Sequence, residues 1–464
     1  MEQITHYITR IADTLGGYPL FFLLIGGGLY LFLSSGMVSL RRLPHAVREL
    51  RRKGSADGSG QISSAQALAS TIGATVGLGS IAGVAIALVL GGPGAIFWMW
   101  VSAMLGMCTK YHEGVLTTMF KGRDDHGVPQ GGTMHIIERG LGPRWTPLAK
   151  FFAIAGMFGT LCIMNANQLT EACMSTFTTP EGVASSGVLS TVGGALGLGN
   201  DQAFKLLFGC AVCVVVALVI FGGIRRIATV ASVLVPFMVG LYFVMVLYII
   251  LTNIHGVPAV VGRIFREAFS LRAGFGAFIG IAIIGARRAA LVNDAGIGTA
   301  TLMHGASRNE NPVREGLIAM LGPSIDSGLV CTLTAIAILL CGNIDVDGVQ
   351  GLQVAVGAFS NAIPGGEYLL MLVVACFALS SMFSYSFYGS TCASYLFGSR
   401  AAVWYRLVFI LSMVLFAMIP LEAAVGVCDL FYALMAFATM TTVIILSGHV
   451  RRATRAYFAK ESEK

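Results

Sequence analysis

The stretch from Gly73 to Gly83 reads Gly-Ala-Thr-Val-Gly-Leu-Gly-Ser-Ile-Ala-Gly and lies in an apolar segment long enough to cross a membrane. Each of its four glycines costs about 1 kcal/mol relative to alanine in a helix interior. The pattern therefore predicts an interrupted helix, unwound around Gly77 and Gly79, whereas close helix packing is the favoured interpretation for Gly83. Unwound backbone at membrane depth needs hydrogen-bond partners from protein or a water-filled cavity, so the stretch indicates a binding site.

The composition is that of an all-α integral membrane protein. Of 464 residues, 56% are hydrophobic and 11% are charged, whereas soluble domains carry roughly a quarter charged residues. The net charge of +7 does not indicate a nucleic-acid partner, because the basic residues gather between apolar runs, as they do in cytoplasmic loops. The ten cysteines lie mostly within apolar runs, so we expect no structural disulfides.

About eleven segments are predicted to span the membrane. They are residues 18–40, 63–90, 94–120, 147–174, 203–221, 229–252, 267–286, 313–341, 366–397, 403–421 and 426–446. The basic run 41–53 identifies the first connection as cytoplasmic, so we expect the N-terminus outside and the C-terminus in the cytoplasm of a bacterial inner-membrane type plasma membrane. Alternation then makes residues 287–312 a cytoplasmic loop, and the outer connection 253–266 is expected to hold a short interfacial helix.

The ten helices after the first fall into two sets of five with opposite orientation. Each set opens with a glycine-rich helix, and the second carries Gly274, Gly276, Gly280 and Gly285. Paired interrupted helices at corresponding places point to an inverted-repeat transporter. We therefore divide the chain into an extra N-terminal helix with a basic loop (1–62), a first repeat (63–252), a second, inverted repeat (253–447) and a basic cytoplasmic tail (448–464).

Three blocks of sequence resemble the alanine or glycine:cation symporter family. The first covers residues 80–88, 91–101 and 105–113, the second covers 293–298 and Asn311-Pro-Val-Arg-Glu-Gly through Gly322, and the third covers 385–389 and 395–398. The resemblance implies the leucine-transporter fold, an inverted repeat of five plus five helices. It also implies a secondary active symporter that imports a small neutral amino acid of the alanine or glycine class on a sodium gradient by alternating access.

The substrate and sodium sites are predicted at the interrupted helix. Free N–H groups at the positive end of a half-helix suit a substrate carboxylate, and carbonyls of the preceding half-helix suit a dehydrated Na⁺. The resemblance adds an Asn-x-x-Gln pair, a serine pair for sodium and a tyrosine that could roof the pocket. The substrate candidates are Thr75, Gly77, Leu78, Gly79, Ser80, Asn165, Gln168, Gly280 and Tyr385, and the sodium candidates are Gly73, Val76, Ser380 and Ser381.

Alternatives remain open for these residues. Amide and tyrosine side chains also pack between helices, and serine hydroxyls bond to their own helix. The chain has Leu78, Ser80 and Tyr385 where the family usually has Thr, Asn and Trp. These departures keep open a proton-coupled carrier, or a carrier of another small amino acid or amine. A channel is less favoured, because no ring of charges is evident.

Ionisable residues within apolar segments are further functional candidates. Asp326 is expected to belong to a buried structural network, although Asp326 or Asp429 would serve a proton-driven cycle. Arg287, Arg288 and Asp294 suggest a cytoplasmic gate of ion pairs. No helical zinc-protease motif or phosphate loop is present, so we do not expect an enzyme. The expected partners are the amino acid, Na⁺ and the lipid bilayer, and the sequence does not indicate an oligomeric state.

Overall fold

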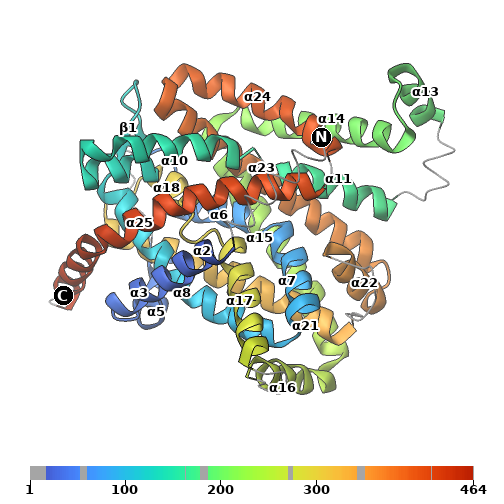
Figure 1. Ribbon diagram of the computed structural model, residues 1–464, viewed down its shortest axis with the longest axis horizontal. Coiled ribbons are helices and arrows are strands. Elements are labelled where there is room, and N and C mark those ends of the chain that lie inside the picture. The colour runs from blue at the N-terminus through green and yellow to red at the C-terminus, as the bar shows by residue number, and fades with distance from the viewer. Residues whose placement is uncertain are drawn as a thin grey trace.

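The computed structural model describes residues 17–52, 60–161, 163–177, 187–269, 275–341, 351–419 and 421–462, almost all of them helical (Figure 1). The first half contains α2 (Tyr18–Phe21), η1 (Phe22–Gly26), α3 (Gly27–Ser34), α4 (Val38–Arg41), α5 (Leu43–Arg51), α6 (Ser64–Thr75), α7 (Leu78–Gly91), α8 (Gly94–Met119), α9 (Thr133–Ile136), η2 (Ile137–Leu141), η3 (Pro143–Trp145), α10 (Thr146–Gly159), α11 (Ile163–Phe177), α13 (Gly187–Leu196) and α14 (Asn200–Ile220). The second half contains α15 (Gly223–Thr252), η4 (Ile254–Gly256), α16 (Val257–Ala268), α17 (Phe275–Val292), α18 (Thr299–Gly305), α19 (Pro312–Ala319), α20 (Leu321–Pro323), η5 (Ser324–Val330), α21 (Cys331–Cys341), α22 (Leu352–Ala362), α23 (Gly366–Phe397), α24 (Ser399–Met418) and α25 (Leu421–Ser462).

A small hairpin departs from the all-helical prediction. Strands β1 (Gly122–Arg123) and β2 (Pro129–Gln130) pair antiparallel in the connection that follows α8. One carboxylate oxygen of Asp124 accepts hydrogen bonds from the backbone N–H groups of His126 at 2.9 Å and Val128 at 2.8 Å. A short aspartate side chain that satisfies backbone donors two and four residues on stabilises such a turn.

Within the described residues, seven helices are long and apolar enough to span a membrane, and the bent pair α6–α7 makes an eighth. All eight correspond to predicted spans. The count of eleven is therefore not reached, because α8 and α17 do not meet this criterion and the N-terminal apolar run Tyr18–Ser34 is shorter. A helix was found in the connection 253–266, where α16 begins at Val257.

Helix α8 lies at the centre of the bundle and packs against α17, α18 and α19. Its second half is buried, including the ionisable side chains of Lys110 and Glu113. Gly114 allows α19 to approach closely, because a Cβ atom there would lie 2.9 Å from the Cα atom of Gly316. A helix that is buried on all sides is expected in the core of a large bundle.

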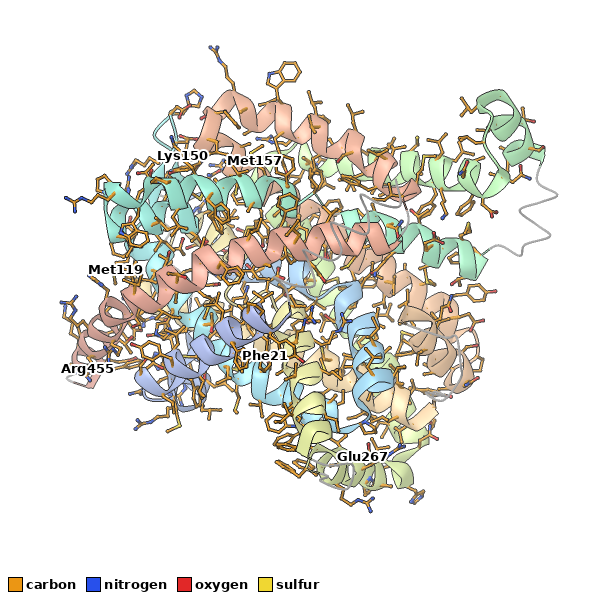
Figure 2. All side chains as sticks on the ribbon, viewed as in Figure 1. Phe21, Met119, Lys150, Met157, Glu267 and Arg455 are labelled. Carbon is orange, nitrogen blue, oxygen red and sulfur yellow. The ribbon has the colours of Figure 1, made fainter. Side chains whose placement is uncertain are left out.

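Helix α25 crosses one face of the bundle, and its C-terminal end projects beyond the other helices (Figure 1). Figure 2 shows Arg455 on this projecting end. The neighbouring Arg451 and Arg452 are also exposed. Basic residues at the end of a spanning helix are typical of its cytoplasmic side.

The glycine-rich stretch does interrupt a helix, at Val76 and Gly77. Helix α6 begins with a capping box between Ser63 and Gln66, and α7 continues at an angle of 45° after the break. Val76 and Gly77 are both extended. The expected unwinding of Gly79 is wrong, because this residue belongs to the first turn of α7. A Cβ atom on Gly79 or Gly83 would meet the side chain of Val292 at 3.7 or 3.3 Å, so these glycines pack against α17.

A second interruption lies at residues 293–298, between α17 and α18. Asp294, Gly296 and Gly298 have φ angles of 51°, 88° and 95°, the left-handed region that favours glycine. The prediction of an interruption among the glycines of 274–285 is wrong for the described part, because α17 runs unbroken from Phe275 to Val292. Gly285 serves packing instead, since a Cβ atom there would lie 2.2 Å from the carbonyl oxygen of Ala95.

Candidate transport site

A cavity of about 230 Å³ lies at the break between α6 and α7. Residues from the α6–α7 break, α11, α17, α23 and α25 line it, together with Asp294 from the second interruption. The two interruptions therefore meet at one site, although more than 200 residues separate them along the chain. The polar lining residues are Thr75, Asn165, Gln168, Arg288, Asp294, Ser381, Tyr385, Asp429 and Tyr432.

Eight of the residues predicted for the site line this cavity. From the substrate set these are Thr75, Gly77, Leu78, Gly79, Asn165, Gln168 and Tyr385, and from the sodium set Ser381. The N–H groups of Leu78 and Gly79, in the first turn of α7, have no acceptor within that helix and carry the positive end of its dipole. The N–H of Ser80 is already bonded to the carbonyl of Gly77 at 3.1 Å.

Two substrate candidates do not line the cavity. Ser80 is fully buried and donates its hydroxyl to Asp326 at 2.6 Å. Gly280 lies two turns before Arg288 on the continuous helix α17, which corresponds to about 12 Å along the axis. The prediction for Gly280 assumed an interrupted helix around it, and that interruption lies at residues 293–298 instead.

The sodium candidates surround the carbonyl end of α6. Ser380 donates its hydroxyl to the carbonyl of Gly73 at 2.8 Å. The Ser381 hydroxyl lies 3.1 Å from the carbonyls of both Gly73 and Ala74. Both hydroxyls also bond to Phe377 in their own helix, at 2.9 and 3.1 Å. Hydroxyl and carbonyl oxygens together form a set of ligands suited to a hard cation. Val76 is buried beside them and does not line the cavity.

Charged residues that sequence reasoning placed elsewhere also line the cavity. Arg288 and Asp294 were predicted in a cytoplasmic loop, and this is wrong because the chain turns inward after Val292 and buries residues 293–298. One carboxylate oxygen of Asp294 accepts hydrogen bonds from the hydroxyls of Thr299 at 3.3 Å and Tyr385 at 3.4 Å. Arg288 interacts electrostatically with Asp429, which lines the cavity from α25. The signal available in the sequence was the pair of glycines in Asp294-Ala-Gly-Ile-Gly298.

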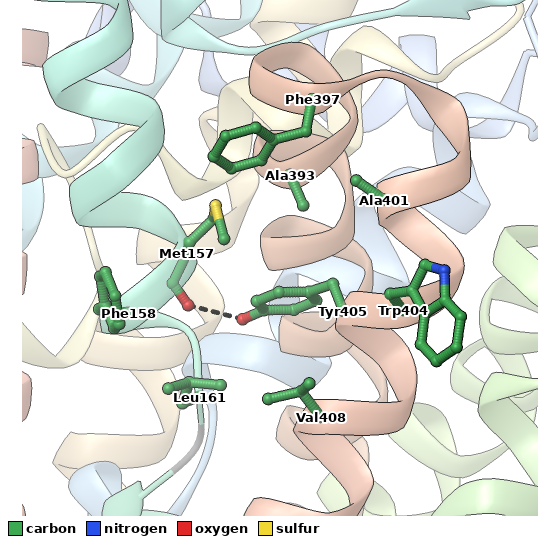
Figure 3. A pocket seen from close by; sticks show the side chains of 9 residues that line it. All are labelled: Met157, Phe158, Leu161, Ala393, Phe397, Ala401, Trp404, Tyr405 and Val408. Atoms are coloured by element: carbon green, nitrogen blue, oxygen red, sulfur yellow. Dashed lines mark hydrogen bonds between the residues drawn. The ribbon is translucent and has the colours of Figure 1, made fainter.

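A second cavity, of about 240 Å³, has a different character (Figure 3). It lies between α10, α23 and α24, and apolar side chains such as Phe397 and Trp404 line it. The hydroxyl of Tyr405 is already used, since it donates to the carbonyl of Met157 at 2.6 Å. This cavity offers no set of charged or amide groups for a zwitterion, so the polar cavity is the candidate transport site.

The fold is that of solved membrane transporters. The crystal structure of MhsT in complex with L-phenylalanine superposes with a TM-score of 0.50 over 83% of this chain and 89% of that chain, at 15% identity. This likeness shows that the chain has the leucine-transporter fold. The model of the sodium:alanine symporter family matches residues 1–464, and the chain belongs to this family.

Relatives of similar length agree with this assignment. The sodium/alanine symporter AgcS of Methanococcus maripaludis is 34% identical over 94% of this chain and 93% of its own length. An uncharacterized transporter of Haemophilus influenzae is 36% identical over 98% of this chain and 97% of its own length. The protein is thus a multi-pass membrane carrier rather than an enzyme, and the family implies Na⁺ as the coupling ion.

Proposed function

We propose that this carrier imports a small neutral amino acid of the alanine or glycine class, driven by the sodium gradient, through alternating access around the polar cavity. The observation that carries the proposal is the position of Ser381. Its hydroxyl contacts the carbonyls of Gly73 and Ala74 at the end of α6, and the same residue lines the cavity. One side chain thus joins the candidate ion site to the candidate substrate site.

The cavity suits a small zwitterion. Its volume of about 230 Å³ falls below the 300–1,000 Å³ of typical drug-sized sites. The N–H groups of Leu78 and Gly79 would hold the substrate carboxylate. Asp294, with the side chains of Asn165 and Gln168, would receive the ammonium group.

The membrane arrangement in this proposal follows the charge pattern and the two interruptions. The N-terminus lies outside and the C-terminus in the cytoplasm of the plasma membrane. The breaks after α6 and α17 support two inverted units, 63–252 and 253–447. Movement of one bundle of helices against the other would open the cavity alternately to each side.

A second candidate is a carrier driven by protons, or one for another small amino acid or amine. The side chains of Asp294 and Asp429 line the cavity and can bind protons, which supports the proton-driven alternative. The sequence departures Leu78 and Tyr385 both line the cavity, which favours keeping the alternative of changed specificity.

Uptake into proteoliposomes tests the proposal. The purified carrier is reconstituted, and accumulation of labelled alanine and glycine is measured with an inward Na⁺ gradient, an inward proton gradient or neither. We expect accumulation only with the Na⁺ gradient, and competition by unlabelled small amino acids. Accumulation driven by the proton gradient alone would favour the second candidate. The absence of alanine and glycine uptake under every gradient would reject the proposed substrate class.

A further inference from the structure

Four ionisable residues form a buried ionic cluster beside the cavity. They are Lys110 and Glu113 of α8, Asp294 of the second interruption and Asp326 of η5, and none is more than 2% exposed. Lys110 interacts electrostatically with each of the three carboxyl groups. The cluster brings together three segments that are distant in the sequence, at the depth of the two helix interruptions.

The single ammonium group of Lys110 can offset only one of the three carboxyl groups. In the described part of the chain, no ion pair within 4.0 Å includes Lys110. Its Nζ atom also has no hydrogen-bond acceptor among the described residues. If all four groups were ionised, three carboxylates and one ammonium would leave a net charge of −2. A buried net charge of this size is costly, so the cluster requires additional positive charge.

Protons are better suited than a metal ion to supply this charge. Within the described residues, the only group of three His, Cys, Asp or Glu ligand atoms that lie within 4.8 Å of one another is His45, Glu49 and Glu461, far along the chain from the cluster. The three carboxyl groups of the buried ionic cluster therefore do not place three ligand atoms within this distance of one another. A proton needs only one carboxyl oxygen.

The three carboxyl groups differ in their surroundings. One oxygen of Glu113 accepts a hydrogen bond from the backbone N–H of Gly296 at 2.9 Å, and Lys110 lies one turn away, so the charge of Glu113 is offset in part. Asp326 is fully buried and does not line the cavity. Asp294 is the member of the cluster that lines the cavity. The hydrogen bonds that it accepts from the hydroxyls of Thr299 and Tyr385 are long, at 3.3 and 3.4 Å.

We propose that the buried ionic cluster is a proton-binding site, in which Asp294 holds the proton that exchanges with the cavity. Asp326 retains a second proton, and Lys110 balances Glu113. When the substrate ammonium binds the Asp294 carboxylate, the O–H bond of the protonated carboxyl breaks and one proton leaves through the cavity. The inference rests on the proposed amino acid substrate. It adds that the substrate ammonium group and a proton compete for the Asp294 carboxylate.

Other titratable groups face the same site. The hydroxyl groups of Tyr385 and Tyr388 from α23 and Tyr432 from α25 interact with Asp294, and the thiol of Cys331 interacts with Asp326. Arg288 and Asp429 line the same cavity. A measured proton effect must therefore be assigned to Asp294 with variants.

Binding calorimetry provides the first test. Binding of alanine to the purified carrier in Na⁺ is measured across pH, and at one pH in buffers of different ionisation enthalpy. We expect release of up to one proton, and an apparent affinity that weakens by as much as about tenfold for each unit of lower pH in the acid range. Asp294→Asn should abolish both effects. Glu138→Gln, which alters a partly buried carboxyl bonded to Tyr395, should retain both.

Infrared spectroscopy provides a test that does not depend on substrate. Wild-type carrier should show a carbonyl band from protonated carboxyl groups that titrates with pH, and Asp294→Asn should lose part of this band. If alanine does not bind but Asp294→Asn loses part of the band, the proposed substrate fails and the proton site stands. If alanine binds to the wild type with no proton release at any pH, the proton site is rejected, whether or not the variants fold.

Discussion

Ser381 is the residue at which the proposed ion and substrate sites meet. Its hydroxyl is shared between two carbonyls of α6 and one carbonyl of its own helix, all at 3.1 Å. A single hydroxyl proton cannot serve three acceptors at once, so the oxygen retains lone pairs for a cation. Ser380 contacts the carbonyl of Gly73 but does not line the cavity, which makes it the more structural member of the pair.

We predict that Ser381→Ala raises the Na⁺ concentration for half-maximal uptake by about three- to tenfold. The loss of one neutral oxygen contact corresponds to roughly 0.5–1.5 kcal/mol. The measurement is alanine uptake into proteoliposomes across Na⁺ concentrations. Ser386→Ala is the matched control, because the Ser386 hydroxyl is equally buried and bonds to Phe383 in its own helix. An unchanged Na⁺ dependence in Ser381→Ala would remove this residue from the ion site.

At the scale of the element, the bent pair α6–α7 determines the geometry of the cavity. The break gives carbonyl groups at the end of α6, which suit a cation, and N–H groups at the start of α7, which suit an anionic group. Gly77 has φ −141°, an extended conformation that any residue adopts. Glycine is therefore favoured here because it has no side chain. A Cβ atom at this position would lie 3.2 Å from the hydroxyl oxygen of Ser381.

Gly77→Leu should reduce uptake by at least about tenfold while the protein still reaches the membrane. The larger side chain would occupy the cavity and displace Ser381, and overpacking of this kind costs about 1–3 kcal/mol. Gly77→Ala should give a smaller loss. Uptake is compared with the amount of folded carrier, measured by size-exclusion chromatography in detergent. Gly240→Ala serves as the control, because no atom lies within 4 Å of its Cβ position. Normal uptake by Gly77→Leu would place the substrate elsewhere.

At the scale of the whole molecule, the cavity exists only where several helices meet, namely α6, α7, α10, α11, α17, α23 and α25. The residues around the cavity come from both proposed repeats, and those of the second repeat include residues of the long helix α25. Distant elements also meet around Glu315 of α19, which accepts a hydrogen bond from the hydroxyl of Ser64 at the start of α6 and contacts His304 of α18, both at 2.6 Å. Ligands that bridge these elements should stabilise the folded carrier as a unit.

We expect alanine to raise the thermal unfolding temperature in Na⁺ and to have little effect when choline replaces Na⁺ at equal ionic strength. A ligand at 100 times its dissociation constant stabilises the folded state relative to the unfolded state by about 2.7 kcal/mol. Shared contacts at Ser381 make the two binding events depend on each other. Thermal unfolding of the detergent-solubilised carrier provides the measurement. Equal stabilisation by alanine in choline and in Na⁺ would contradict the proposed coupling.

The sequence by itself determined the membrane class, most of the spans, the family and the first helix interruption. The family was indicated by the resemblance of three sequence blocks. The other features depend on local properties of the chain, namely apolar run length, basic segments and the cost of glycine in a helix. Gly77, Asn165, Gln168 and Tyr385 were reached by this reasoning and by the resemblance, and all four line the cavity.

Only the tertiary structure located the second interruption and the charges around the cavity. The glycines of α17 suggested a break, yet Gly285 permits a close helix contact, and packing against Ala95 is not visible in a one-dimensional pattern. From the sequence, Arg288 and Asp294 were assigned to a loop, because charged side chains are usually exposed to water. In the fold they are brought into the interior, where Tyr385 and the other elements of the cavity surround them. The position of a charge in a bundle depends on which helices pack around it, and that is decided by contacts between distant parts of the chain.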